Sequence, residues 1–226
     1  MIVRIASYNV HGCVGGDGRR DPARVGRVLR ALDAQVIALQ EVEFEAGERA
    51  PGALLAELPG FHAICAPIER HGQPFGNALL TRLPTAHARR ICLAYPCREP
   101  RTALEVVLET GARPLRVVAT HLGLRPVERR FQVRKILEHV GGDETSVTVL
   151  LGDFNEWFLI GRPLRWLHAR YGRGPGVRTY PARFPMFALD RIWVHPRRAL
   201  EAFAARADGE ARVASDHLPV VADVAV

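Results

Sequence analysis

Residues 147–157, VTVLLGDFNEW, join the pattern of a buried strand to a pair of polar side chains. The first five residues form a short apolar run that includes the β-branched residues typical of strands. Gly152 follows, and we expect it to let the backbone turn tightly at the strand end. Asp153 and Asn155 come next, spaced two apart, so both face one way if the chain stays extended. A buried carboxylate at this point is costly unless another group compensates its charge.

The composition around this stretch is that of an ordinary globular protein. Of 226 residues, 24% are charged and 48% hydrophobic, and no linker or low-complexity segment divides the chain. We therefore expect a single domain over residues 1–226. No apolar run has the length of a membrane span, and the first ten residues do not resemble a signal peptide. The sequence predicts a cytoplasmic protein, and since nothing in it indicates a protein partner, a monomer.

The chain is strongly basic, with a net charge of +7 and a pI near 9.9. Lys135 is the single lysine, so arginine supplies nearly all of the positive charge. The arginines are scattered apart from short clusters, and this charge is compatible with a polyanionic partner without naming one. The four cysteines do not have zinc-site spacing, and a disulfide framework is not expected.

Short β-like runs alternate with helical segments along the whole chain. Strands are predicted at 2–8, 36–40, 61–66, 76–82, 86–93, 102–109, 114–120, 146–151, 190–194, 199–205 and 219–225. Helices are predicted from Asp21-Pro22 onward and at 52–58, 127–140 and 161–171, with Gly141-Gly142 ending the third and a loop at 172–176. Several strands follow one another without a helix, which favours antiparallel pairing. The pattern predicts an α/β fold with two packed sheets flanked by helices.

Polar side chains recur where these apolar strands begin or end. They are Asn9 and His11, Gln40 and Glu41, His121, Asp153 and Asn155, Asp190, and the run Ser215-Asp216-His217. Each alone is explained by a turn, a helix start or an ion pair, but their recurrence indicates a site on a rigid sheet edge. Carboxylates with amide oxygens suit a hard cation such as Mg²⁺ or Mn²⁺. Two histidines with a further carboxylate suit phosphate chemistry.

Seven motifs taken together resemble the endonuclease/exonuclease/phosphatase superfamily, which includes the pancreatic-type deoxyribonucleases. They are SYNVHG (7–12), ALQEVE (38–43), FGNALLTR (75–82), ATHLGL (119–124), LLGDFNEW (150–157), LDRIWV (189–194) and SDHLPVVADV (215–224). They stand in the family's order from about residue 3 to 224. The resemblance implies a four-layer α/β sandwich with two central, mostly antiparallel sheets and a site at one end of both.

The resemblance also implies which residues hold a metal and a substrate. Glu41 resembles the principal ligand of Mg²⁺ or Mn²⁺, with Asn9 beside it and Asp216 completing the metal environment. Asn77 and Arg101 resemble residues that steady the substrate.

The remaining polar residues resemble the family's catalytic groups. Asp153 resembles the residue that orients or deprotonates the attacking water, and Asn155 its neighbour that holds a phosphate oxygen. His217 resembles the histidine at the scissile phosphate, and Asp190 the carboxylate that fixes its tautomer. His121 resembles the second histidine, near the phosphate or leaving group.

Three functions follow from these expectations. The first is a metal-dependent phosphodiesterase, with DNA or RNA favoured as the substrate by the basic charge. The second keeps this chemistry on a phospholipid, a sphingomyelin-type lipid or a small phosphoester, with peripheral lipid contact. Phe154 and residues 157–160, WFLI, would favour that lipid interface if exposed, but we expect them to pack under the following helix. The third is an inactive basic nucleic-acid-binding module, against which the intact polar set argues.

Overall fold

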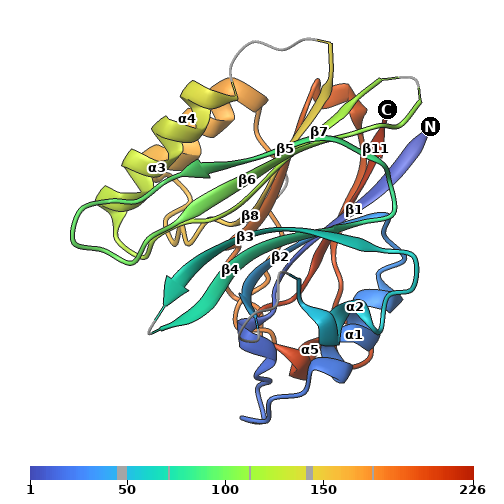
Figure 1. Ribbon diagram of the computed structural model, residues 1–226. Helices are drawn as coiled ribbons and strands as arrows, with labels where there is room; N and C mark the ends of the chain where they lie inside the picture. The colour runs from blue at the N-terminus through green and yellow to red at the C-terminus, as the bar shows by residue number, and fades with distance from the viewer. Residues whose placement is uncertain (45–49, 71, 112, 141–144, 175) are drawn as a thin grey trace.

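The computed structural model describes residues 1–226 except 45–49, 71, 112, 141–144 and 175. Its described strands form one sheet in the order β10-β11-β1-β2-β4-β3 and a second in the order β5-β6-β7-β8-β9 (Figure 1). The strands are β1 (Ile2–Asn9), β2 (Val36–Glu43), β3 (His62–Arg70), β4 (Gln73–Thr81), β5 (Thr85–Cys92), β6 (Thr102–Leu108), β7 (Leu115–His121), β8 (Val147–Asp153), β9 (Asp190–His195), β10 (Leu200–Ala205) and β11 (Val220–Ala225). The helices are α1 (Pro22–Ala31), α2 (Gly52–Leu55), α3 (Pro126–His139), α4 (Arg162–Tyr171) and α5 (Ala211–Ala214), with short 3₁₀ turns at His11–Cys13 and Arg197–Ala199.

The two sheets pack face to face between two layers of helices (Figure 1). Alternate residues of β8 show why, because Leu151 lies in the core between the sheets while Leu150 faces α3 and α4. The outer face of the other sheet packs against α1, α2 and α5, where Val25 and Leu29 of α1 are buried. The predicted four-layer sandwich is confirmed.

The start of α1 forms as its sequence predicts. The side chain of Asp21 accepts a hydrogen bond from the backbone N–H of Arg24 at 2.9 Å, and Pro22 occupies the first turn. This cap fixes where the helix begins and turns its apolar stripe toward the sheet.

The topology brings strand ends from both sheets to one edge. All pairings among the described strands are antiparallel except β1–β2 and β7–β8, which are parallel. Parallel neighbours end at the same edge of a sheet. Because β11 and β9 run antiparallel to β1 and β8, they begin at the edge where β1 and β8 end.

Gly152 differs from the expectation of a turn at the strand end. β8 continues through Gly152 to Asp153, and Gly152 pairs with Thr120 of β7. A Cβ atom on Gly152 would lie 1.8 Å from the carbonyl oxygen of Thr120, and its φ is +140°. The position therefore requires glycine because the backbones of two neighbouring strands approach each other closely.

The second predicted helix and two predicted breaks in the chain differ in how the structure describes them. The helix expected at 52–58 is shorter, since α2 ends at Leu55 and turns follow it. The stop signal Gly141-Gly142 and Pro175 of the predicted loop lie outside the described residues. None of the described helices is both long enough and apolar enough to cross a membrane.

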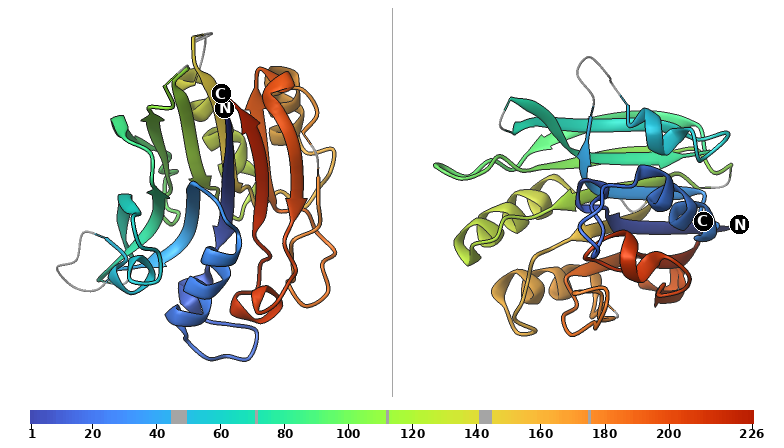
Figure 2. Two further views of the ribbon diagram at one scale, coloured as in Figure 1. Left: turned by 90° about the vertical axis from the view of Figure 1, so that its right-hand side faces the viewer. Right: turned by 90° about the horizontal axis from the view of Figure 1, so that it is seen from below.

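The two chain ends lie side by side, as Figure 2 shows. The amino group of Met1 donates to the carbonyl oxygen of Val226 at 2.8 Å, and Ile2 pairs with Ala225. This contact is at the opposite end of β1 from Asn9, so both ends of the chain lie far from the edge where the strand ends converge.

Candidate active site

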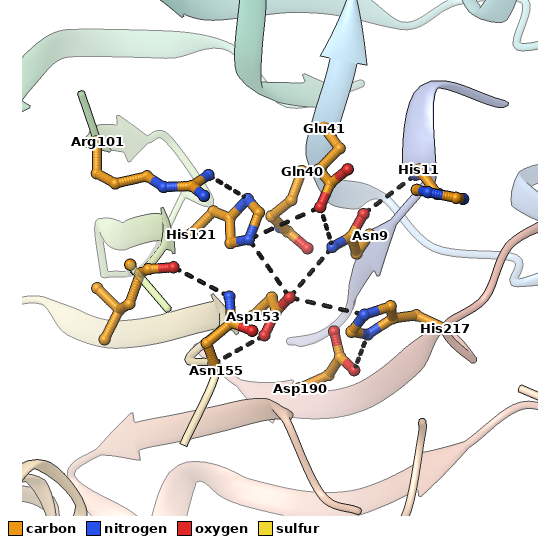
Figure 3. Close-up of polar contacts among 12 residues, drawn as sticks. Asn9, His11, Gln40, Glu41, Arg101, His121, Asp153, Asn155, Asp190 and His217 are labelled. Carbon is orange, nitrogen blue, oxygen red and sulfur yellow. Dashed lines mark hydrogen bonds and ion pairs between the residues drawn. The ribbon is translucent and has the colours of Figure 1, made fainter. Parts of the chain in front are cut away.

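Side chains from both sheets meet at this edge (Figure 3). Asn9 ends β1 and lies between two carboxylates, since its Nδ2 donates to Glu41 Oε1 and to Asp153 Oδ2, each at 3.1 Å. Its Oδ1 accepts from the backbone N–H of His11 at 3.1 Å. Asn9 therefore presents its nitrogen, not its oxygen, to the carboxylates, and its role as a metal ligand stays a prediction.

A β-bulge directs Glu41 into the site. Leu39 pairs with Ala78 and Val42 with Gly76, so two residues of β2 stand opposite the single Asn77 of β4. Glu41 also has a φ of +56°, which is rare for a residue with a side chain. A bulge of this kind re-aims a side chain, and here it sends the Glu41 carboxylate toward Asn9.

The chain does not stay extended after Asp153. The backbone N–H of Asn155 donates to Asp153 Oδ1 at 2.9 Å, and Asn155 has a φ of +49°. The Asn155 side chain donates to the carbonyl oxygen of Leu122 at 3.0 Å. This turn leaves Asp153 Oδ2 directed at the centre of the site while the Asn155 amide joins two loops.

His217 and Asp190 form a buried hydrogen-bonded pair. His217 Nδ1 lies 2.8 Å from Asp190 Oδ2, which also accepts from Thr179 Oγ1 at 2.5 Å. His217 Nε2 lies 3.7 Å from Asp153 Oδ2. Burial disfavours the imidazolium, but the charges of Asp190 and Asp153 outweigh it and raise the pKa of His217 to about 10. His217 is thus a cationic hydrogen-bond donor in the metal-free protein.

The His121 ring is neutral, whereas the His217 ring is cationic. Its Nδ1 lies 3.0 Å from Nη1 of Arg101, and because a guanidinium only donates, Nδ1 must accept. Burial, together with the charge of Arg101, lowers the pKa of His121 well below its ordinary value. The ring is therefore neutral, and its proton is on Nε2, which faces Glu41 Oε1 at 3.8 Å and Asp153 Oδ2 at 3.5 Å.

The carboxylates at this edge lack basic partners other than histidine. Within the described part of the chain, no lysine or arginine pairs with Glu41, Asp153, Asp190 or Asp216. Burial, with Asp190 adding to it, raises the pKa of Asp153 to about 6. These four carboxylates share one cationic imidazole, that of His217, so the edge keeps an excess of negative charge on its oxygen donors. This is the environment that a hard divalent cation occupies, so these residues fit such an ion.

One group of three side chains also has metal-like spacing. The ligand atoms of Asp153, Asp190 and His217 lie within 4.8 Å of one another. The short His217–Asp190 hydrogen bond explains this closeness, and a cation there would displace it. Glu41 and Asp216 also line the open cavity, and their side chains are more exposed than those of Asp153 and Asp190. The predicted metal position beside Glu41 and Asp216 is therefore the more accessible one.

A cavity of about 230 Å³ opens at this edge. It is lined by Glu41, Arg70, Phe75, Glu99, Arg101, His121, Leu124, Asp153, Asn155, Trp157, Tyr180, Leu189, Asp216 and His217. Asn77 is absent from this lining, because its amide donates to the carbonyl oxygen of Thr102 at 2.9 Å and joins β4 to β6. Arg101 lines the cavity but bonds His121. The substrate roles of both residues stay predictions.

Sequence reasoning missed Thr179 and Tyr180 around the dyad and gave Ser215 no role. Thr179 bonds Asp190, the Tyr180 ring lies 4.9 Å from the His217 ring, and Ser215 Oγ donates to the carbonyl oxygen of Asn9 at 2.7 Å. Ser215 was singled out with the SDH motif, but its hydrogen bond to Asn9 was not predicted. Thr179 and Tyr180 come from a loop with no pattern of its own, so only the fold reveals them.

The expectation that Phe154 and residues 157–160 pack under the next helix holds for Phe154, which is buried in one core cluster with Leu164 and Leu167 of α4, and is wrong for residues 157–160. Leu159 and Ile160 are 75% and 83% exposed, and Trp157 and Phe158 are exposed as well. The reason is that Phe154 and the apolar side of α4 already fill the space beside Trp193 in the core. The segment therefore has no apolar cavity to enter and lies on the surface.

The chain is similar to known proteins in both sequence and fold. It is 33% identical over 158 residues to the uncharacterized protein YbhP of Escherichia coli K12, a match that covers 66% of this chain and 62% of YbhP. The chain thus matches less than two thirds of the length of that curated relative.

Solved structures extend the likeness to the whole chain. An endonuclease/exonuclease/phosphatase from Beutenbergia cavernae has a TM-score of 0.77 at 23% identity, covering 100% of this chain and 72% of that chain. TDP2 of D. rerio, in complex with a single-strand DNA product, has a TM-score of 0.74 at 17% identity, covering 100% and 99%. The model of the Endonuclease/Exonuclease/phosphatase family matches residues 6–217. The chain belongs to the Endonuclease/Exonuclease/phosphatase family, whose members are hydrolases of phosphate esters.

Proposed function

We propose that the protein is a divalent-metal-dependent phosphodiesterase that cleaves a P–O bond by in-line attack of water. The observation that supports it best is the convergence of Glu41, Asp153, His121 and the Asp190–His217 pair on one cavity. This set combines carboxylates that outnumber their cationic partners with one cationic and one neutral imidazole, which are the groups that phosphoryl transfer uses.

Glu41 and Asp216, with Asn9 beside them, would hold Mg²⁺ or Mn²⁺. The ion would neutralise charge on a phosphoryl oxygen and on the leaving oxygen. The bulge that directs Glu41 into the cavity fixes this carboxylate before substrate arrives, so little reorganisation is needed.

Asp153 and the two histidines would handle the water and the developing charge. Asp153 has a pKa of about 6, so at neutral pH it is ionised yet more basic than an ordinary carboxylate, which suits a group that orients and deprotonates water. His217, held by Asp190, donates a hydrogen bond where negative charge grows, while Asn155 would hold a phosphate oxygen. The neutral His121 presents Nε2–H to the phosphate or leaving group.

A screen for hydrolysis with Mg²⁺ and Mn²⁺ tests the proposal. Substrates would be bis(p-nitrophenyl) phosphate, plasmid DNA, single-stranded RNA, sphingomyelin, cardiolipin and inositol phosphates. We expect metal-dependent turnover of at least one diester that EDTA abolishes, and a loss of about 100-fold or more in Glu41→Gln.

Glu43→Gln is the matched control, because Glu43 lies on the same strand but is half-exposed and pairs with Arg20 at 3.2 Å. It should keep wild-type rates. Equal rates in Glu41→Gln and the wild type, or no hydrolysis with either metal, would contradict the proposal.

Separate observations support the finer assignments of substrate and location. DNA or RNA as the substrate is supported by the basic charge and by the complex of TDP2, a neighbour in fold, with a single-strand DNA product. A lipid phosphodiester is supported by the exposure of residues 157–160. A cytoplasmic monomer remains the expectation from the sequence.

A further inference from the structure

Seven large apolar side chains are exposed on segments next to the cavity-lining residues Trp157 and Tyr180. They come from two segments of the connection between β8 and β9, and we call them the apolar rim: Trp157, Phe158, Leu159, Ile160, Phe184, Met186 and Phe187. A soluble surface seldom displays this many large apolar side chains together unless a partner covers them.

Ring contacts join the rim to the catalytic centre. The Trp157 ring lies 4.9 Å from the Phe187 ring and 5.6 Å from the Tyr180 ring, and Tyr180 in turn lies 4.9 Å from His217. Trp157 and Tyr180 also line the cavity. The two segments are therefore one surface, and a partner seated on it would reach the site directly.

The same connection carries an unusual concentration of positive charge. Residues 157–189 contain six arginines and no aspartate or glutamate, which is most of the net charge of +7. The arginines Arg162, Arg165, Arg178 and Arg183 are exposed. Arg183 lies over the ring of Phe184, with 5.5 Å between the guanidinium carbon and the ring centroid. The partner must therefore be anionic as well as apolar.

The types of side chain distinguish two anionic partners. Single-stranded nucleic acid binds by stacking bases on aromatic rings, which Leu159, Ile160 and Met186 lack. Insertion into lipid uses aliphatic side chains, with aromatic ones at the boundary of the head groups and basic ones above it. The most exposed members of the rim are the aliphatic Leu159 and Ile160.

We propose that the apolar rim docks on the surface of an anionic lipid bilayer. If the proposed phosphodiesterase activity holds, the substrate is then a phosphodiester head group that enters the cavity from that surface. Leu159 and Ile160 insert among the acyl chains, Trp157 lies at the head groups beside the cavity mouth, and the arginines contact lipid phosphates.

Sedimentation with vesicles tests the docking without any hydrolysis. The metal-free wild type should bind vesicles containing phosphatidylglycerol and bind pure phosphatidylcholine more weakly. The double variant Leu159→Ser/Ile160→Ser should lose at least about tenfold in partitioning to the anionic vesicles. Arg178→Gln/Arg183→Gln should reduce the preference for phosphatidylglycerol. Brominated phosphatidylglycerol should quench tryptophan emission, and Trp157→Phe should remove most of that quenching.

Ile2→Ser is the matched control, because Ile2 is also exposed but lies at the other end of β1. It should bind vesicles as the wild type does. A wild type that ignores anionic vesicles, or a double variant that binds them normally, would overturn the inference. So would a double variant that loses affinity for a labelled single-stranded oligonucleotide but not for vesicles. Hydrolysis of bis(p-nitrophenyl) phosphate, measured in parallel, reports on the proposed function separately.

Discussion

Among the carboxylates around His217, Asp190 contributes most to keeping the ring charged. We predict that Asp190→Asn lowers the pKa of His217 from about 10 toward or below 6.5, since burial then acts with less opposition. Turnover should fall about 100-fold or more because the cationic donor is lost at neutral pH. An NMR titration of the His217 ring in EDTA would measure the shift directly.

The Asp190–His217 pair also contributes to the stability of the fold. How this contribution changes with pH follows from the raised pKa of His217. A protonated group favoured by the fold stabilises it fully below the unfolded pKa, near 6.5, and this contribution is lost as pH rises through about 10. The stability difference between the metal-free wild type and Asp190→Asn should therefore shrink between these values. A His217 ring that titrates alike in both proteins would refute the assigned pair.

Residue roles were harder to predict than residue positions. Asp153, His121 and His217 could be placed at a shared site because each follows or precedes an apolar strand. The hydrogen bond from Arg101 to His121 could not be predicted, because the sequence shows only that Arg101 is charged. In the structure this hydrogen bond fixes the tautomer of His121. Asn77 likewise bonds a backbone carbonyl that only the pairing of the two sheets brings near.

Among the elements, the pairing of β7 with β8 depends on Gly152. We predict that Gly152→Ala destabilises the protein by more than about 3 kcal/mol, because its Cβ would overlap the Thr120 carbonyl and its φ is +140°. Urea unfolding would measure the change. Gly16→Ala serves as the control, since no atom lies within 4 Å of its added Cβ. Similar losses in both variants would show that the close approach is not the cause.

Element boundaries were predictable where local patterns set them and not where packing did. The cap at Asp21-Pro22 and the apolar run of β8 are local, and both were confirmed. The bulge at Glu41 depends on the register with β4, which residues 36–40 do not specify. The exposure of 157–160 depends on space already filled by Phe154 and α4, which an apolar pattern alone does not reveal.

The whole molecule should respond to metal through its carboxylate edge. A ligand that binds only the folded state stabilises it, by about 2.7 kcal/mol at 100 times its dissociation constant. For a chain of this length, saturating Mg²⁺ or Mn²⁺ should then raise the Tm by about 5–10 °C. Glu41→Gln should lose most of this rise and Glu43→Gln should retain it, as differential scanning calorimetry with and without EDTA would show. An equal rise of the Tm in Glu41→Gln would show that the metal does not bind at Glu41.

The charge of the molecule is also organised in a way that counting arginine clusters did not show. The acid-free stretch 157–189 forms the connection between two site strands and carries most of the net charge. The informative signal was the absence of acids over a long stretch rather than the presence of neighbouring arginines.

The contact between Met1 and Val226 makes the protein suitable for fluorescent labelling and for circular permutation. β1 separates that contact from Asn9 by about 25 Å at the usual rise per residue. A fluorophore at either end would remain well outside a bilayer docked at the rim, so energy transfer to a lipid dye would report the tilt of β1 against the membrane. A short linker joining the two ends would give a circular permutant in which new ends can be opened elsewhere without touching the catalytic edge.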